Sequence, residues 1–170
     1  MDYGVKNAVL HSINSNKIPT FKSLLKCSSA LSKLGDASTI MYIQNIVKQN
    51  YKYLSENENN LEHYLCEALF RSGNQDKALQ NLAVLIDNCT NVKRVRETTC
   101  FLIRMMPQAS EDHQKQAYEI ADKFISLRNE NKPAAVLLEV AFLSKQNNLT
   151  KLAGLLLEKY PELLQEREED

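Results

Sequence analysis

Apolar residues recur at intervals of three and four along most of the chain, which is the spacing that places them on one face of an α-helix. Two clear examples are the rows Leu79, Leu82, Leu85, Ile86 and Ala117, Ile120, Ala121, Phe124. Pro133 fits the first turn of a further helix, and Pro161 precedes a short acidic one. The pattern predicts an all-α protein of roughly ten helices.

A short motif marks where several of these helices end. It reads Leu, any residue, Lys or Arg, any residue, Gly or Asn, Asp or Asn, and it occupies 31–36, 69–74 and 143–148. Gly35 and Gly73 are 38 residues apart, and Asn147 follows after 74, twice 37. We expect Gly35, Gly73 and Asn147 to adopt the left-handed conformation that ends a helix. The midpoint of the longer interval is Ser110, where another helical pattern opens after Pro107.

A nearly constant spacing of this size is typical of stacked helix pairs. We therefore predict an α-solenoid of about four antiparallel helix-turn-helix repeats that form a right-handed superhelix. The repeats would cover about 20–54, 60–90, 92–128 and 133–165, within a single helical-repeat domain over residues 1–170. We also expect the chain to be a fragment of a longer protein. Arrays of this kind bind other molecules and seldom catalyse, so the prediction is a non-catalytic binding module.

Two segments resemble known helical repeats. Residues 21–51, which begin Phe-Lys-Ser-Leu-Leu-Lys and end Ile-Val-Lys-Gln-Asn-Tyr, look like a pentatricopeptide repeat. Residues 64–79 fit either a pentatricopeptide or a tetratricopeptide repeat. Pentatricopeptide proteins of this kind are mostly organellar RNA-binding proteins, so the resemblance implies single-stranded RNA as the ligand and a role in mitochondrial RNA metabolism. The base-reading position of that family falls on His63 in the second repeat, on Lys22 or Leu25 in the first, and on Leu137 in the fourth.

The first 54 residues are basic, with seven lysines against two aspartates. Lys22, Lys26 and Lys33 share one helical face that could hold phosphates, although a solvated helix face explains the same spacing. Lys48, Tyr51 and Lys52 interleave phosphate-binding and base-stacking side chains, and here the alternative is an aromatic closure of the helix end. Two more candidates for contact with RNA or with a protein partner lie one turn apart in the second repeat, Glu67 and Arg71.

The charge balance keeps a second function open. Lys plus Arg and Asp plus Glu number 21 each, so no net charge attracts the chain to nucleic acid or a membrane. A neutral chain favours a tetratricopeptide-like or HEAT-like scaffold that holds a peptide or helix in a concave groove. No H-E-x-x-H, G-x-S-x-G or phosphate-loop motif occurs. We expect no enzyme activity, no cofactor, no metal site, no small-molecule substrate and no membrane partner.

Four cysteines occur without C-x-x-C spacing: Cys27, Cys66, Cys89 and Cys100. They lie in helical apolar patterns, so we expect reduced thiols, with Cys66 and Cys100 packed among apolar side chains. Reduced cysteines indicate an intracellular, reducing compartment, which is the cytoplasm, the nucleus or the mitochondrial matrix. The resemblance favours the mitochondrial matrix.

Overall fold

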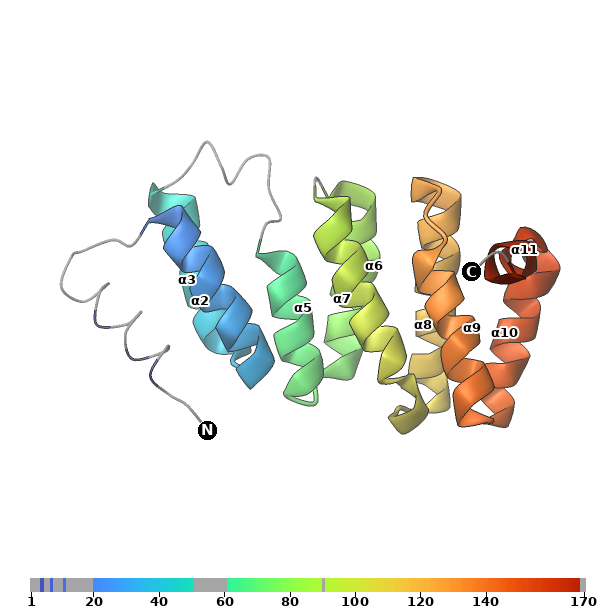
Figure 1. The fold of residues 1–170 in the computed structure, drawn as a ribbon. Helices are drawn as coiled ribbons and strands as arrows, with labels where there is room; N and C mark the ends of the chain where they lie inside the picture. Colours follow the sequence, from blue (N-terminus) through green and yellow to red (C-terminus); the bar gives the residue numbers. More distant parts are fainter. Residues whose placement is uncertain are drawn as a thin grey trace. The chain divides into compact units, whose positions relative to one another are not determined.

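The computed structural model describes residues 20–50, 61–89 and 91–168, together with Gly4, Asn7 and His11. This part of the chain folds into α-helices joined by short turns and contains no strand (Figure 1). The elements are α2 (Phe21–Leu34), α3 (Ala37–Asn50), α5 (Glu62–Arg71), α6 (Gln75–Asn88), α7 (Val92–Arg104), the 3₁₀ turn η1 (Met106–Gln108), α8 (Glu111–Arg128), α9 (Lys132–Ser144), α10 (Asn147–Lys159) and α11 (Glu162–Glu168). The all-α prediction is confirmed. The superhelix and its handedness stay predictions.

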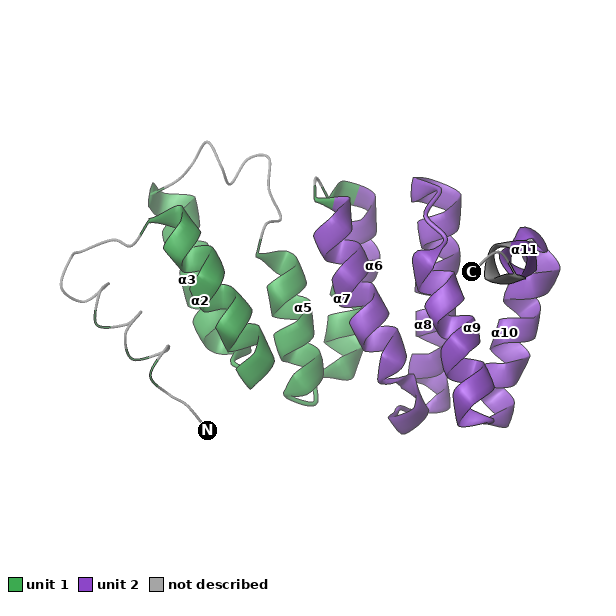
Figure 2. Cartoon of the chain, in the orientation of Figure 1, with its two compact units in different colours: residues 1–81, 88–91 green, residues 82–87, 92–170 purple. Residues whose placement is uncertain are grey.

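The chain divides into two compact units (Figure 2). Unit 1 comprises residues 1–81 and 88–91, and unit 2 comprises residues 82–87 and 92–170. In unit 1, α2 packs against both α3 and α5. In unit 2, α7 packs against α9 and α8 packs against α10, so the pairs α7–α8 and α9–α10 lie side by side in two layers. This is the local packing that helical repeats need, because each pair buries its apolar face against the next.

The buried side chains are largely those that the helical spacing predicted. In α6 the buried residues are Ala78, Leu79, Leu82, Leu85 and Ile86. In α8 they are Ala117, Ile120, Ala121 and Phe124. Cys66 in α5 and Cys100 in α7 are buried too, as expected. Rows spaced by three and four thus form the helix faces on which the packing depends.

Gly35 and Gly73 end α2 and α5 in the same way. Both have positive φ, 74° at Gly35 and 98° at Gly73. The Gly35 amide donates to the Ser32 carbonyl at 3.2 Å, and the Gly73 amide donates to the Phe70 carbonyl at 3.2 Å. In each turn the next amide also donates to the carbonyl five residues back, at 3.0 Å and 2.9 Å respectively. The left-handed helix ends predicted at these two glycines are confirmed.

We expect Gly73→Ala to lower the free energy of unfolding by about 1 kcal/mol, because an L side chain is strained at a φ of 98°. No atom lies within 4 Å of the Cβ that the substitution adds, so backbone strain is the main cost. Gly154 lies inside α10 with equally open space, and Gly154→Ala is the matched control. It should raise the free energy of unfolding by about 0.5–1 kcal/mol. Urea unfolding measures both, and equal shifts of the same sign would contradict the assignment of Gly73.

The third turn differs from the prediction. Asn147 is not left-handed but opens α10, and the left-handed residue is Lys145, with φ 58°. Gln146 between them is extended, with φ −77° and ψ 135°. The side-chain amide of Gln146 donates to the carbonyl of Pro107 at 2.7 Å, which ties this turn to η1. α9 therefore ends earlier than the local motif indicates, and the prediction for Asn147 was wrong.

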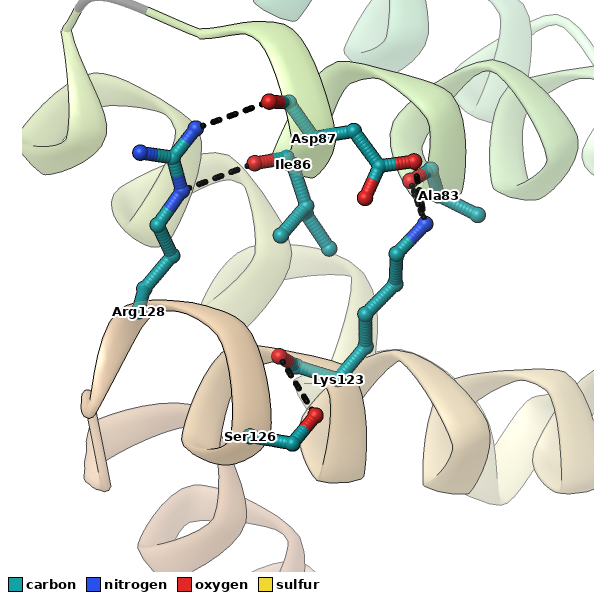
Figure 3. A network of polar contacts seen from close by, with 6 residues as sticks. All are labelled: Ala83, Ile86, Asp87, Lys123, Ser126 and Arg128. Carbon is teal, nitrogen blue, oxygen red and sulfur yellow. Dashed lines mark hydrogen bonds and ion pairs between the residues drawn. The ribbon is translucent and has the colours of Figure 1, made fainter.

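Two cations of α8 complete the C-terminal end of α6. The last turn of α6 has no basic residue of its own. The Lys123 ammonium donates to the Ala83 carbonyl at 2.6 Å and pairs with the Asp87 carboxylate at 2.8 Å (Figure 3). The Arg128 guanidinium donates to the carbonyls of Ile86 and Asp87 at 2.9 Å and 3.2 Å. The Arg128 bonds satisfy last-turn carbonyls, and both cations offset the negative end of the helix dipole. Together they join α8 to the part of α6 that belongs to unit 2.

Candidate functional site

The three lysines predicted to share a face of α2 are exposed. Lys22, Lys26 and Lys33 lie on the side of the helix opposite the buried Leu24 and Leu31. The ion pairs that the structure shows among described residues involve other cations, so these three ammonium groups are not neutralised there. We call Lys22, Lys26 and Lys33 the lysine face. Phosphate binding at this face stays a prediction.

The candidates at the end of the first repeat are only partly described. Lys48 is exposed in the last turn of α3. Tyr51 and Lys52 lie outside the described residues. Their interleaving of aromatic and basic side chains therefore stays a prediction from the sequence.

His63 is buried, with 6% of its surface exposed, and this counts against direct base reading. Its ring lies 3.9 Å from the ring of Tyr64, between centroids, at a tilt of 43°. Glu67 and Arg71 pair with one another at 3.1 Å on the same helix. An ion pair of this spacing stabilises a helix by a few tenths of a kcal/mol, which accounts for Glu67 and Arg71 without any contact to a ligand.

A groove opens on the surface of unit 2. Its volume is about 380 Å³. It lies along α9 beside the end of α7 and η1, and it is lined by Arg104, Pro107, Val136, Glu139, Val140, Leu143 and Ser144. Most of the lining is apolar, with one cation and one carboxylate. We call this opening the apolar groove.

Two large apolar side chains at the end of α9 are mostly in solvent. Phe142 and Leu143 are each 69% exposed, the highest values among the large apolar residues of the described chain. Leu143 is also part of the groove wall. Sequence reasoning missed this surface because it treated Leu143 only as the leucine of the helix-end motif. The available signal was the composition of residues 133–143, where apolar residues occur all round the helix and Glu139 is the single charge.

Cations gather beside the apolar groove. A smaller cavity of about 100 Å³ is lined by Arg96, Glu97, Cys100, Arg104 and Lys132, and it shares Arg104 with the groove. Arg96 is already paired with Glu130 at 2.8 Å. Among the described residues, Arg104 and Lys132 have no carboxylate within ion-pair distance.

The Cys100 thiol lies at this cavity and is 2% exposed. Burial raises the pKa of Cys100, while the nearby charges of Arg104 and Lys132 act in the opposite direction. Burial also raises the pKa of Cys66 strongly. A thiol that stays protonated and has no access to solvent is a poor nucleophile, so both cysteines serve as apolar packing groups.

Within residues 20–50, 61–89 and 91–168, no three His, Cys, Asp or Glu side chains converge in a way that could hold a metal ion. The helices of this part are too short or too polar to cross a membrane. All four cysteines are free thiols. Two surfaces of the described residues are candidates for function, the lysine face of unit 1 and the apolar groove of unit 2.

Comparison of the chain with known proteins found no matching protein-family model, no matching curated protein and no matching solved structure.

Proposed function

We propose that this chain is a non-catalytic helical-repeat module that binds a segment of another protein in the apolar groove of unit 2. The exposure of Leu143 in the wall of the groove, next in sequence to the equally exposed Phe142, carries the proposal. Neighbouring large apolar side chains in water are unfavourable for an isolated domain and mark interaction surfaces. The lining of the groove is mixed and mainly apolar, which suits a peptide or helix better than a phosphate backbone.

The resemblance of residues 64–79 to a tetratricopeptide repeat supports the same proposal, because such arrays hold peptides between their helices. The packing of α7 beside α9 supports it as well, since the groove lies along α9 where α7 ends. Side chains on two rigid helices are better placed for binding than side chains on a loop, because the helices fix their spacing.

RNA binding at the lysine face is the second candidate. Lys22, Lys26 and Lys33 are exposed on one side of α2 and are not neutralised by described carboxylates. The pentatricopeptide resemblance of residues 21–51 supports this candidate, and a role in mitochondrial RNA metabolism rests on the same resemblance. Lysines act as point charges, so we propose contacts to phosphates and not to base edges.

Selection from a phage-displayed library of random 16-residue peptides tests the leading proposal. We expect the wild-type protein to enrich peptides that bind it in fluorescence anisotropy titrations. Leu143→Asp should lower the affinity of these peptides by roughly tenfold or more, because it places a charge in the apolar wall. Leu143 is mostly exposed, so the variant should keep the wild-type melting temperature. Enriched peptides that bind both proteins equally would contradict a role for the groove.

The triple variant Lys22→Ala, Lys26→Ala, Lys33→Ala is the matched control. It should bind the selected peptides as the wild type does, because it leaves unit 2 unchanged. The same variant decides the RNA candidate in filter-binding titrations with single-stranded RNA at two salt concentrations. If the lysine face binds phosphates, the slope of log K against log salt should fall by roughly 0.7 for each lost contact. RNA binding that depends on the lysine face, with no enriched peptides, would replace the leading proposal by the second.

A further inference from the structure

The apolar wall of the groove is a straight row along α9. Val136, Val140 and Leu143 are spaced by four and three residues, so they lie on one face of the helix. At about 1.5 Å per residue the row is about 10 Å long, which matches two turns of a second helix. An amphipathic helix that lies in a groove presents apolar residues at the same spacings, i, i+3 or i+4, and i+7. The groove thus offers contacts of the right kind and length for a helical segment.

The face that carries this row begins with a cation. Lys132 is the first residue of α9 and lies one turn before Val136, in line with the apolar row. Arg104 reaches the same region from α7, because it lines both the groove and the smaller cavity in which Lys132 takes part. The groove therefore adjoins two cations, Arg104 in its own lining and Lys132 in the smaller cavity that shares Arg104 with it.

These two cations differ from the other arginine nearby. Arg96 has its carboxylate, Glu130, at 2.8 Å. Arg104 and Lys132 have no carboxylate within ion-pair distance among the described residues. Both lie close to Cys100, where their charges oppose the rise in its pKa that burial causes. Two cations beside an apolar surface attract an anionic group more strongly than the same cations in open solvent, because the apolar surface excludes water.

We propose that the occupant of the apolar groove is an acidic amphipathic helix of a partner protein. Its apolar residues contact Val136, Val140 and Leu143, and its carboxylates pair with Arg104 and Lys132. Glu139 also lines the groove, so the partner's carboxylates gather at one end of the helix and not along its whole length. This inference rests on the proposed function, since it assumes that the groove binds protein.

The sequences of the selected phage peptides test the inference. Binders of the wild type should combine apolar residues at helical spacing with an excess of Asp and Glu at one end. The double variant Arg104→Glu, Lys132→Glu should instead select peptides rich in Lys and Arg. In anisotropy titrations at low salt, Arg104→Glu should lower the affinity of an acidic peptide by roughly tenfold. The same variant should bind more tightly than the wild type to that peptide after its acidic residues are changed to Lys.

Arg94→Glu is the matched control, because Arg94 is an exposed arginine of α7 that lines neither cavity. It should change the affinity of the acidic binder much less than Arg104→Glu does. Binders without acidic bias, or equal effects of the two reversals, would overturn the inference and leave protein binding intact. A failure to enrich any Leu143-dependent peptide would instead contradict the proposed function. Self-association that Leu143→Asp abolishes and the peptide prevents would assign the groove to a second copy of the chain and also overturn the inference.

Discussion

Phe124→Ala should lower the free energy of unfolding by about 3–5 kcal/mol, the usual cost of emptying a buried phenylalanine site. The Phe124 side chain has no exposed surface, and it continues the row of Ala117, Ile120 and Ala121 along α8. α8 packs against both α9 and α10, so the neighbours are rigid helices that cannot easily close the cavity. The chain has no tryptophan, and far-UV circular dichroism in urea is therefore the suitable measurement.

Phe142→Ala is the matched control for this substitution. It removes the same side chain from α9, in the same unit, but from a site that is 69% exposed. We expect a change within about 0.5 kcal/mol. Similar losses for the two variants would contradict the burial that separates them. A stable Phe142→Ala variant would also show that this phenylalanine is not required for folding.

Much of the core could be predicted from the sequence because helical periodicity is a local property. A row such as Leu82, Leu85 and Ile86 lies on one face of any helix that contains it, whatever packs against that face. The glycine turns were predictable for a similar reason. Gly35 and Gly73 have positive φ, a conformation that few other residues adopt without strain, so the residue type indicates the local geometry.

The third turn shows where local reasoning ends. The left-handed residues Gly35 and Gly73 lie four residues after buried leucines, Leu31 and Leu69. Lys145 lies four residues after Ala141, which is also buried. The helix end is therefore shifted by two residues from the motif.

That shift explains the apolar groove. In the motif Leu143 corresponds to Leu31 and Leu69, which are in the core, but in the structure Ala141 takes their place. Leu143 is left on the surface and forms a wall of the groove. The shifted turn is hydrogen-bonded to the preceding pair of helices, and contacts between residues so far apart in the chain are not visible in the local motif.

The candidate sites divide in the same way. Exposure of Lys22, Lys26 and Lys33 followed from their spacing opposite the apolar row of α2. The burial of His63 could not be predicted in this way, because a histidine can lie on either face of a helix. His63 falls on the face of the buried Cys66 and Phe70, at spacings of three and seven. A periodicity that counts only aliphatic residues passes over such a position.

The hydrogen bonds behind the shifted turn converge on one buried amide. Gln114 in α8 is 2% exposed. Its Nε2 donates to the Met106 carbonyl at 2.9 Å and to Oε1 of Gln146 at 3.0 Å, and its Oε1 accepts from the Asn148 side chain at 2.8 Å. Gln114 thus joins η1, α8 and the α9–α10 turn within unit 2. Nothing in the local sequence distinguishes it from Gln108 or Gln116, since the bonds span as many as 34 residues.

Gln114→Leu should lower the free energy of unfolding by about 2–3 kcal/mol, because it removes the hydrogen bonds to Met106, Gln146 and Asn148 from a buried site. Gln108→Leu, at an exposed site in η1, is the control and should change the free energy of unfolding by less than about 0.5 kcal/mol.

Gln114→Glu keeps the shape of the side chain but makes the effect depend on pH. Burial should raise the pKa of the new carboxyl above its unfolded value of about 4.3. The deficit relative to wild type is then smallest below pH 4.3 and grows as pH rises towards the folded pKa, by about 1.4 kcal/mol for each pKa unit of the shift. Urea unfolding at pH 4 and pH 7 measures this. Wild-type stability of Gln114→Leu, together with a pH-independent deficit for Gln114→Glu, would show that the amide network does not hold the α9–α10 turn.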